Sequence, residues 1–214
     1  MKKLLAATTL LFAMALAGSA FAQEVAVSTA PTDGGFKPMV VGGAISMGMA
    51  HSIVDEGDPK PRFAGGGSAY FDFYLMEMLA LEGNLGMVGK GCRVEVGDDD
   101  VKTKLIYMEI GLGAKLNIKG FRAALLVVPA IGLSGKYKTD NASQDVDWDR
   151  DNIRRFNLGL KVGLGYAIPV GPIAIVPGLD WSIHLLNDYD GPGDAKARAM
   201  NLMFNVGVEF GFGG

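Results

Sequence analysis

The sequence predicts an all-β fold, a closed eight-stranded antiparallel up-and-down β-barrel that spans a membrane. Two observations predict it. Eight segments alternate apolar and polar residues with the period of two that a β-strand imposes. The links between them alternate as well, between very short turns and long acidic loops, which is the arrangement of connections found in transmembrane barrels.

Residues 1–22 are expected to be a cleaved signal peptide and not part of the fold. Lys2 and Lys3 form a basic start, an uncharged apolar stretch follows, and Ala20–Ala22 is an A-x-A cleavage site. The apolar stretch is shorter than the about 20 residues that a membrane helix needs. Residues 23–35 are small and polar and are expected to form a flexible tail. The barrel domain is therefore assigned to residues 36–214.

The eight predicted strands have boundaries that are good to about 2–4 residues. They lie near residues 39–50, 63–75, 79–89, 105–118, 121–135, 155–168, 173–186 and 200–212. Pro129 and Pro177 fall inside the fifth and seventh strands. Because proline removes a hydrogen-bond donor from the ladder, we expect a local bulge at each.

The two faces of each strand differ in the same way along the chain. In the first strand, Met39, Met47 and Met49 share the apolar face, and in the next two Asp72 and Glu82 lie on the polar face. The fourth strand has an apolar face of Ile106, Met108, Ile110, Leu112, Ala114, Leu116 and Ile118. Its polar face is Tyr107, Glu109, Gly111, Gly113, Lys115 and Asn117. The remaining four strands repeat the pattern.

The apolar faces are expected to contact lipid. None of the eight carries a charged residue, and one Lys or Arg on the lipid face at mid-bilayer would cost about 2–4 kcal/mol. A soluble barrel of the lipocalin kind would turn the apolar face inward, but eight strands could hardly enclose so much Leu, Ile, Val, Met and Phe. The Gly, Ala, Ser and Asn of the polar faces suit a narrow interior that side chains just fill.

The connections predict the orientation. Short turns at Glu77, 117–120 and 169–172 are expected to face the periplasm, and both chain termini lie on the same side. The long loops are expected to face outside. They contain residues 51–61, 94–104, 138–152 and 187–196.

Composition excludes several classes of function. The formal charge is −3, which becomes −5 without the two leader lysines, and there is no basic patch, so nucleic acid is not expected as a partner. Cys92 is the only cysteine, so the fold has no internal disulfide. Two histidines are too few for a metal site of their own, and no cofactor or resident metal is predicted.

Charged residues on the polar faces form the main candidate site. Those that point inward by parity are Asp72, Glu82, Lys90, Glu109, Lys115, Arg122, Arg155, Lys161, Asp180 and Glu209. Buried charges need partners, and here the two signs nearly balance. We interpret the set as a static network of ion pairs that fills the lumen. The alternative is a narrow or gated polar channel.

Asp180, Ser182 and His184 share the inward face of the seventh strand and suggest a catalytic triad. Neighbours on one strand face are about 6.5–7 Å apart, too far for a hydrogen-bond relay. Small lipid A deacylases of the outer membrane carry a His followed two residues later by a catalytic Ser, but that position here is Leu186. No catalytic residue is therefore predicted.

The long loops are rich in aspartate and are interpreted as solvated surface. Their acidic residues are Asp55, Glu56, Asp58, Asp98, Asp99, Asp100, Asp145, Asp147, Asp149, Asp151, Asp188, Asp190 and Asp194. Binding of a divalent cation that orders the loops is the alternative, although Asp188–Gly191 lacks the Glu that ends a calcium loop.

Three segments resemble the outer-membrane β-barrel domain family, which includes the small OmpX-like and PorT-like barrels. These are Ala69–Phe73, Leu79–Gly86 and Asn157–Tyr166, and aromatic residues near the end of the last strand resemble the signal read by the barrel-assembly machinery. The chain departs from the family in ending on Gly213 and Gly214 after Phe212. No peptidoglycan-binding domain of the OmpA kind is expected to follow.

The resemblance implies an integral protein of the bacterial outer membrane, inserted by the barrel-assembly machinery and surrounded by outer-membrane lipids and lipopolysaccharide. We expect a monomer without enzymatic activity, with a structural role or a surface role in which the loops bind an extracellular ligand. A small gated pore is the first alternative, and a lipid-modifying enzyme is the second.

Overall fold

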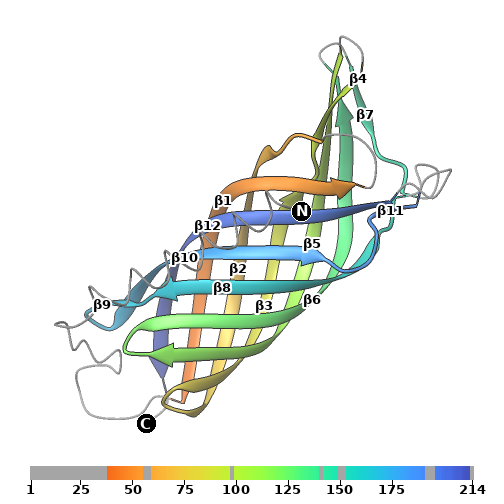
Figure 1. Ribbon diagram of the computed structural model, residues 1–214. Helices are drawn as coiled ribbons and strands as arrows, with labels where there is room; N and C mark the ends of the chain where they lie inside the picture. The colour runs from red at the N-terminus through yellow and green to blue at the C-terminus, as the bar shows by residue number, and fades with distance from the viewer. Residues whose placement is uncertain are drawn as a thin grey trace, which may run out of the picture.

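The computed structural model confirms the predicted fold (Figure 1). It describes residues 38–54, 59–96, 99–139, 142–148, 153–190 and 196–212. The predicted signal peptide and tail lie outside these residues. No helix among them is long and apolar enough to cross a membrane.

Eight long strands form the barrel, and each is antiparallel to its neighbours. They are β1 (Met39–Val54), β2 (Arg62–Met76), β3 (Leu79–Lys90), β5 (Asp99–Ile118), β6 (Phe121–Lys138), β8 (Phe156–Tyr166), β10 (Ile173–His184) and β12 (Lys196–Phe212). The ring is closed because β12 pairs with both β10 and β1. Four short strands lie at its ends: β4 (Arg93–Val96), β7 (Ser143–Asp145), β9 (Ile168–Val170) and β11 (Tyr189–Asp190).

The apolar faces point outward, as predicted. Ile45 is 68% exposed and Phe63 is 66% exposed, whereas Asp72 and Lys90 inside the barrel are fully buried. An apolar exterior around a buried charged interior is unstable in water and stable in lipid.

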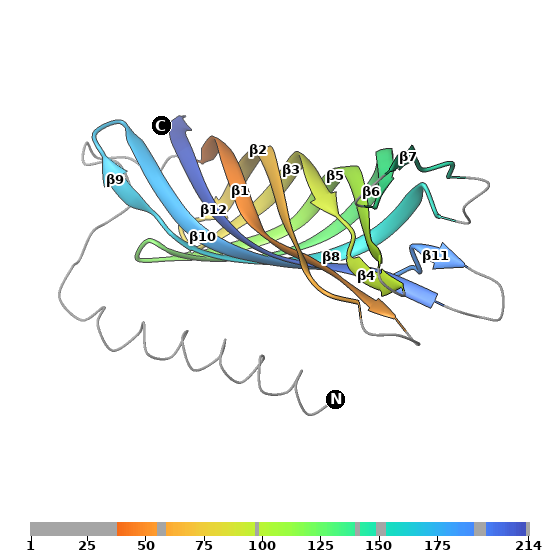
Figure 2. The same ribbon diagram turned by 90° about the horizontal axis from the view of Figure 1, so that it is seen from above.

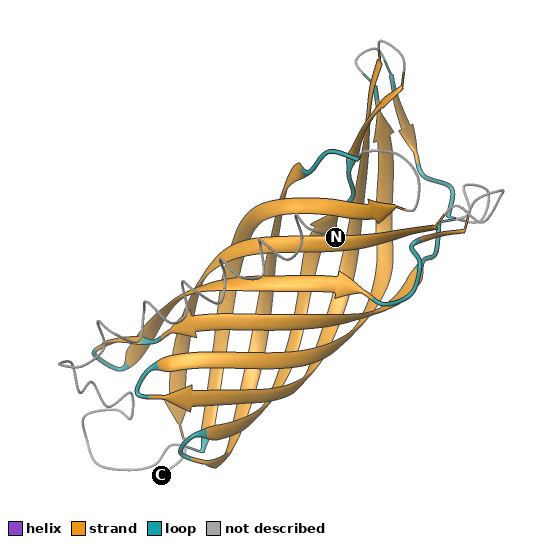
Figure 3. Ribbon diagram, viewed as in Figure 1, coloured by secondary structure: helices purple, strands orange, loops and turns teal. Residues whose placement is uncertain are grey.

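Short turns join β2 to β3, β5 to β6 and β9 to β10, and we call this the short-turn end (Figure 3). Lys119 and Gly120 both have positive φ, 51° and 87°, as a type I′ turn requires. Met39 and Phe212 pair directly, so the first and last barrel strands begin and end at this end too. Figure 2 shows β9 and the C-terminus at one end of the barrel and β4, β7 and β11 at the other, which we call the long-loop end.

The predicted bulges at the two prolines are wrong. At Pro129 the ladder between β6 and β8 runs without a shift, and the ladder to β5 keeps its register across a short gap in pairing. Pro177 pairs with Val206 of β12, and the gap is on the side of β8. Each proline therefore lacks one hydrogen bond of the ladder, and neither strand contains the extra residue that would make a bulge. The shifts that do occur lie between Tyr74 and Met76 and between Ile106 and Tyr107.

The sheet continues beyond the predicted strand ends at the long-loop end. β5 has 20 residues and β6 has 18, although a tilted strand crosses a bilayer in about 9–11. Residues 94–96 and 99–104, predicted as parts of a loop, belong to β4 and to the start of β5, which pair with each other. The backbones of β5 and β6 stay paired here, but apolar and polar residues no longer alternate along them. A strand outside the membrane has no lipid-facing side and therefore needs no apolar face. β4, β5, β6 and β7 together form an extension of four paired strands, at the top of Figure 1.

Candidate functional site

The lumen near the short-turn end holds a lysine between two acids. Lys115 on β5 places Nζ 2.7 Å from Asp72 Oδ2 and 2.9 Å from Glu82 Oε2. Asp72 and Glu82 face each other directly across β2 and β3, so their like charges are tolerable only with a cation between them. The Lys115 ammonium also lies 4.6 Å from the centre of the Tyr70 ring.

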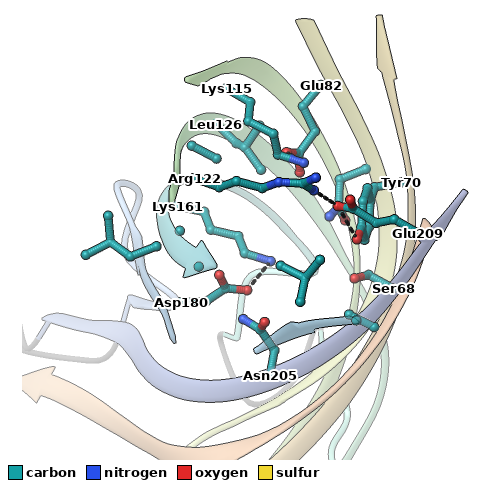
Figure 4. Close-up of a pocket in the computed structure, with 18 residues that line it drawn as sticks. Ser68, Tyr70, Glu82, Lys115, Arg122, Leu126, Lys161, Asp180, Asn205 and Glu209 are labelled. Carbon is teal, nitrogen blue, oxygen red and sulfur yellow. Dashed lines mark hydrogen bonds and ion pairs between the residues drawn. The ribbon is translucent and has the colours of Figure 1, made fainter. Parts of the chain in front are cut away.

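A second ion pair lies beside the first. Arg122 of β6 donates to Glu209 Oε1 of β12, and the Tyr70 hydroxyl donates to the same oxygen at 2.8 Å (Figure 4). All three side chains reach into the barrel from different strands. They link β2, β6 and β12 across the lumen. Such links are expected of side chains that fill the lumen and stabilise the barrel.

A cavity of about 80 Å³, lined by both polar and apolar residues, lies beside these groups. Its lining includes Lys161 and Asp180, whose Nζ and Oδ2 atoms are 2.9 Å apart. Glu209 Oε2 and Arg122 Nε are buried without a protein hydrogen-bond partner. A polar space of this size holds a few ordered waters, which would satisfy such atoms.

Nearer the long-loop end, Lys90 and Glu109 form a pair at 2.8 Å between β3 and β5. The Lys90 side chain is fully buried and that of Glu109 is 11% exposed. This pair adds a further set of buried opposite charges to the lumen, between the neighbouring strands β3 and β5.

Asp188 is the centre of a buried hydrogen-bond network, which we call the Asp188 hub. Its Oδ1 accepts from Asn157 Nδ2 at 3.0 Å and from the Tyr107 hydroxyl at 3.4 Å, and lies 2.5 Å from His184 Nδ1. Its Oδ2 accepts from the Ala199 backbone N–H. The hub joins the loop after β10 to β5, β8 and β12. The prediction that the loop aspartates are solvated is therefore wrong for Asp188.

An apolar plug covers the hub at the mouth of the barrel. Val146 and Ile153 are buried against Leu105, with the rings of Trp148 and Tyr189 packed beside them. The Trp148 ring stands edge-on to the Tyr107 ring at 5.9 Å. Residues 146–148, which follow β7, therefore pack into the mouth of the barrel.

Replacing Gly132 by alanine should displace Trp148 from the plug. A Cβ at this position would lie 2.4 Å from the indole ring, and such overpacking costs about 1–3 kcal/mol. In a Trp181→Phe background, the emission of Trp148 should shift to longer wavelength as the ring meets water. Gly43→Ala is the matched control, because its Cβ would meet nothing closer than 3.6 Å. Unchanged emission in both variants would contradict the packing.

The structure places nine of the ten network residues predicted for the candidate site in the lumen. They are Asp72, Glu82, Lys90, Glu109, Lys115, Arg122, Lys161, Asp180 and Glu209. Arg155 is a correction: it is exposed, and its Nε donates to the Gly132 carbonyl. The alternation used to place it does not apply, because β8 begins only at Phe156.

The suggested triad is not assembled. The Asp180 carboxylate pairs with Lys161, and His184 pairs with Asp188 instead. Among the described residues, no group of three His, Cys, Asp or Glu side chains could hold a metal ion. Most of the loop acids proposed for a divalent cation lie outside those residues or have side chains that the structure does not describe.

Sequence reasoning missed the Asp188 hub. Asn157 and Tyr107 were assigned to the inward face but not to a site, and Asp188 was assigned to a solvated loop. A carboxylate four residues after His184 was the available signal. This signal was weak because the chain has no regular structure after the end of a strand, so a spacing of four residues does not predict that two side chains meet.

The family model of the outer membrane protein beta-barrel domain matches residues 4–212. Among solved structures, the attachment invasion locus protein Ail of Yersinia pestis is 17% identical, with 79% of this chain and 98% of that chain covered and a TM-score of 0.42. OprG of Pseudomonas aeruginosa is 10% identical, with 84% and 99% covered and a TM-score of 0.41. Curated protein sequences gave no match.

Proposed function

Because the chain belongs to the outer membrane protein beta-barrel domain family, we propose that it acts as a plugged, monomeric barrel whose long-loop end contacts a partner outside the cell. The family is one of the bacterial outer membrane, so lipid surrounds the apolar exterior. The proposal concerns what the barrel does there.

The extension of β4, β5, β6 and β7 is the observation that carries this proposal. A barrel that served only to fill the membrane would not need strands of 18 and 20 residues. In the described part of the chain, β7 pairs with β6 alone. Its other edge offers backbone groups to which an added strand can bind.

The orientation is part of the proposal. Short turns support a periplasmic position for both termini and an outer position for the long-loop end. The aromatic residues Phe210 and Phe212 near the end of β12 support insertion by the barrel-assembly machinery. Lipopolysaccharide would then surround the upper part of the barrel. We propose no enzymatic activity, since His184 is 1% exposed and lies under the plug.

The refolded full-length protein should show no discrete conductance steps in a planar bilayer. The ion pair of Arg122 and Glu209 links β6 to β12 across the lumen, the ion pairs of Lys115 and Lys90 occupy the lumen between neighbouring strands, and the apolar plug lies at one end. Barrel folding is checked by circular dichroism and by the shift of the unheated protein in gel electrophoresis. Reproducible steps from folded protein would refute the plugged barrel and favour the small gated pore.

A surface role is tested by shortening the extension. A variant in which a two-residue turn replaces residues 93–102 keeps the barrel strands and removes the β4 hairpin. Cells that carry it should bind less to protein-coated beads than cells with the wild-type chain, at equal surface expression. Equal binding would leave the barrel with a structural role in the membrane.

A further inference from the structure

The lumen near the short-turn end contains more acids than bases. Its described charged side chains are three carboxylates and two cations, each between 0% and 7% exposed: Asp72, Glu82, Glu209, Lys115 and Arg122. Arg122 and Glu209 pair as one base with one acid, whereas Lys115 pairs with both Asp72 and Glu82 (Figure 4). If all five groups are ionised, this half of the lumen carries one negative charge without a counter-charge.

The neighbouring groups do not supply the missing cation. Lys161 lines the same cavity as Glu82, but its Nζ is 2.9 Å from Asp180 Oδ2, so these two charges already balance. Tyr70 and Tyr74 on β2 add hydroxyl groups and no charge. Burying a carboxylate without a counter-charge is costly, so such a group binds a cation or gives up its charge.

The surplus charge belongs to the pair of Asp72 and Glu82. The two residues are directly opposite each other on β2 and β3, and both carboxyl groups contact the Lys115 ammonium, at 2.7 and 2.9 Å. The second oxygen of Asp72, Oδ1, is buried without a hydrogen-bond partner from the protein. When two carboxyl groups share a site, one proton between them removes their repulsion.

Water inside the barrel gives a proton access to this pair. Glu82 lines the cavity of about 80 Å³, and a second cavity of about 40 Å³ shares Lys161 and Asp180 with it. These two shared side chains are 17% and 21% exposed. A metal ion fits the first cavity less well than a proton does, because Lys115 and Arg122 also line it and would repel the ion.

We propose that the Asp72–Glu82 pair is a binding site for one proton, which the folded barrel takes up and the unfolded chain does not. The protonated pair keeps one negative charge, and Lys115 balances it. Carboxylates of an unfolded chain stay ionised down to about pH 4. Above that pH the proton is bound by the folded barrel alone, so the pair makes the barrel more stable as the pH falls. The inference goes beyond the proposed function and holds for either orientation of the barrel.

The test compares urea unfolding of the full-length wild type and Glu82→Gln in phosphatidylcholine vesicles between about pH 8 and about pH 5. Glutamine replaces the protonated acid, so the variant should take up one proton fewer. The ratio of folded to unfolded protein should therefore rise in the wild type, relative to the variant, by up to about tenfold for each unit of falling pH. Asp72→Asn should behave as Glu82→Gln does. Both histidines are unchanged in these variants, so their titration cancels in the comparison.

The matched control is Glu109→Gln, which removes a luminal acid from the balanced pair with Lys90. It should be less stable than the wild type but keep the wild-type pH dependence. Infrared spectroscopy of the folded protein is an independent measurement. The C=O stretch of a protonated carboxyl group should appear on acidification in the wild type and in Glu109→Gln, but not in Glu82→Gln.

Three outcomes would overturn the inference. One is a pH dependence of Glu82→Gln equal to that of the wild type, and another is the absence of the infrared band from the acidified wild type. The third is a loss of wild-type stability at about pH 8 when choline replaces sodium, which would make the pair a site for a metal cation.

Discussion

Replacing Asp188 by alanine will lower the free energy of unfolding by about 1–3 kcal/mol for each buried donor that loses its acceptor. Asp188 is 6% exposed and accepts from three elements of the barrel wall. Without its carboxylate, the Ala199 N–H loses its acceptor, and the Asn157 amide keeps only the Leu186 carbonyl, at 3.2 Å, in a space that excludes water. Urea unfolding of the protein in phosphatidylcholine vesicles measures the effect.

A control variant distinguishes the loss of the Asp188 hub from the loss of any acidic residue at the long-loop end. Asp145→Ala removes an acid from the same end, but this acid is 82% exposed and lies 3.5 Å from its partner Lys136. Exposed pairs of this kind contribute about 0–1 kcal/mol. If the two variants lost the same stability, Asp188 would be an ordinary loop residue. We also expect proteolysis near residues 185–199 in Asp188→Ala only.

The membrane-spanning parts of the strands could be predicted from the sequence because a polar or charged side chain that faces lipid costs free energy. A charged side chain on the lipid face is costly at any of the eight strands, so alternation is strict from Met39 to Met49 and from Ile106 to Ile118. The same penalty fixed the parity that placed Lys115 and Glu209 inside. Ion-pair partners were not predictable, because they depend on which strands face each other across the lumen.

Outside the bilayer this rule fails. Residues 99–104 and 136–138 continue β5 and β6 by backbone pairing alone, and backbone pairing leaves no mark on side-chain alternation. The same holds for the apolar plug: Val146 and Trp148 lie in an acidic segment whose composition suggests solvated loop. Val146 and Trp148 contact residues that are far away in the sequence, and such contacts cannot be predicted from the pattern of neighbouring residues.

Replacing Lys115 by methionine should destabilise the barrel by about 3–5 kcal/mol. Methionine keeps much of the volume of lysine and removes its charge, so the loss is electrostatic. Asp72 is fully buried and Glu82 is 7% exposed, and the substitution leaves the two carboxylates opposite each other without a cation. Urea unfolding in vesicles is again the measurement, with Lys136→Met on the exposed surface as the control.

The decisive variant is the triple one, Lys115→Met/Asp72→Asn/Glu82→Gln. A buried ionic group replaced by neutral residues of similar volume is often as stable as the original, so this variant should regain most of the lost stability. Recovery would show that the charges balance one another and are not needed for the fold. If the triple variant remained as unstable as Lys115→Met, packing around Tyr70, whose ring lies 4.6 Å from the ammonium, would be the cause. If the triple variant regained stability and conducted ions, the ion pairs of Lys115 with Asp72 and Glu82 would be the groups that close the lumen.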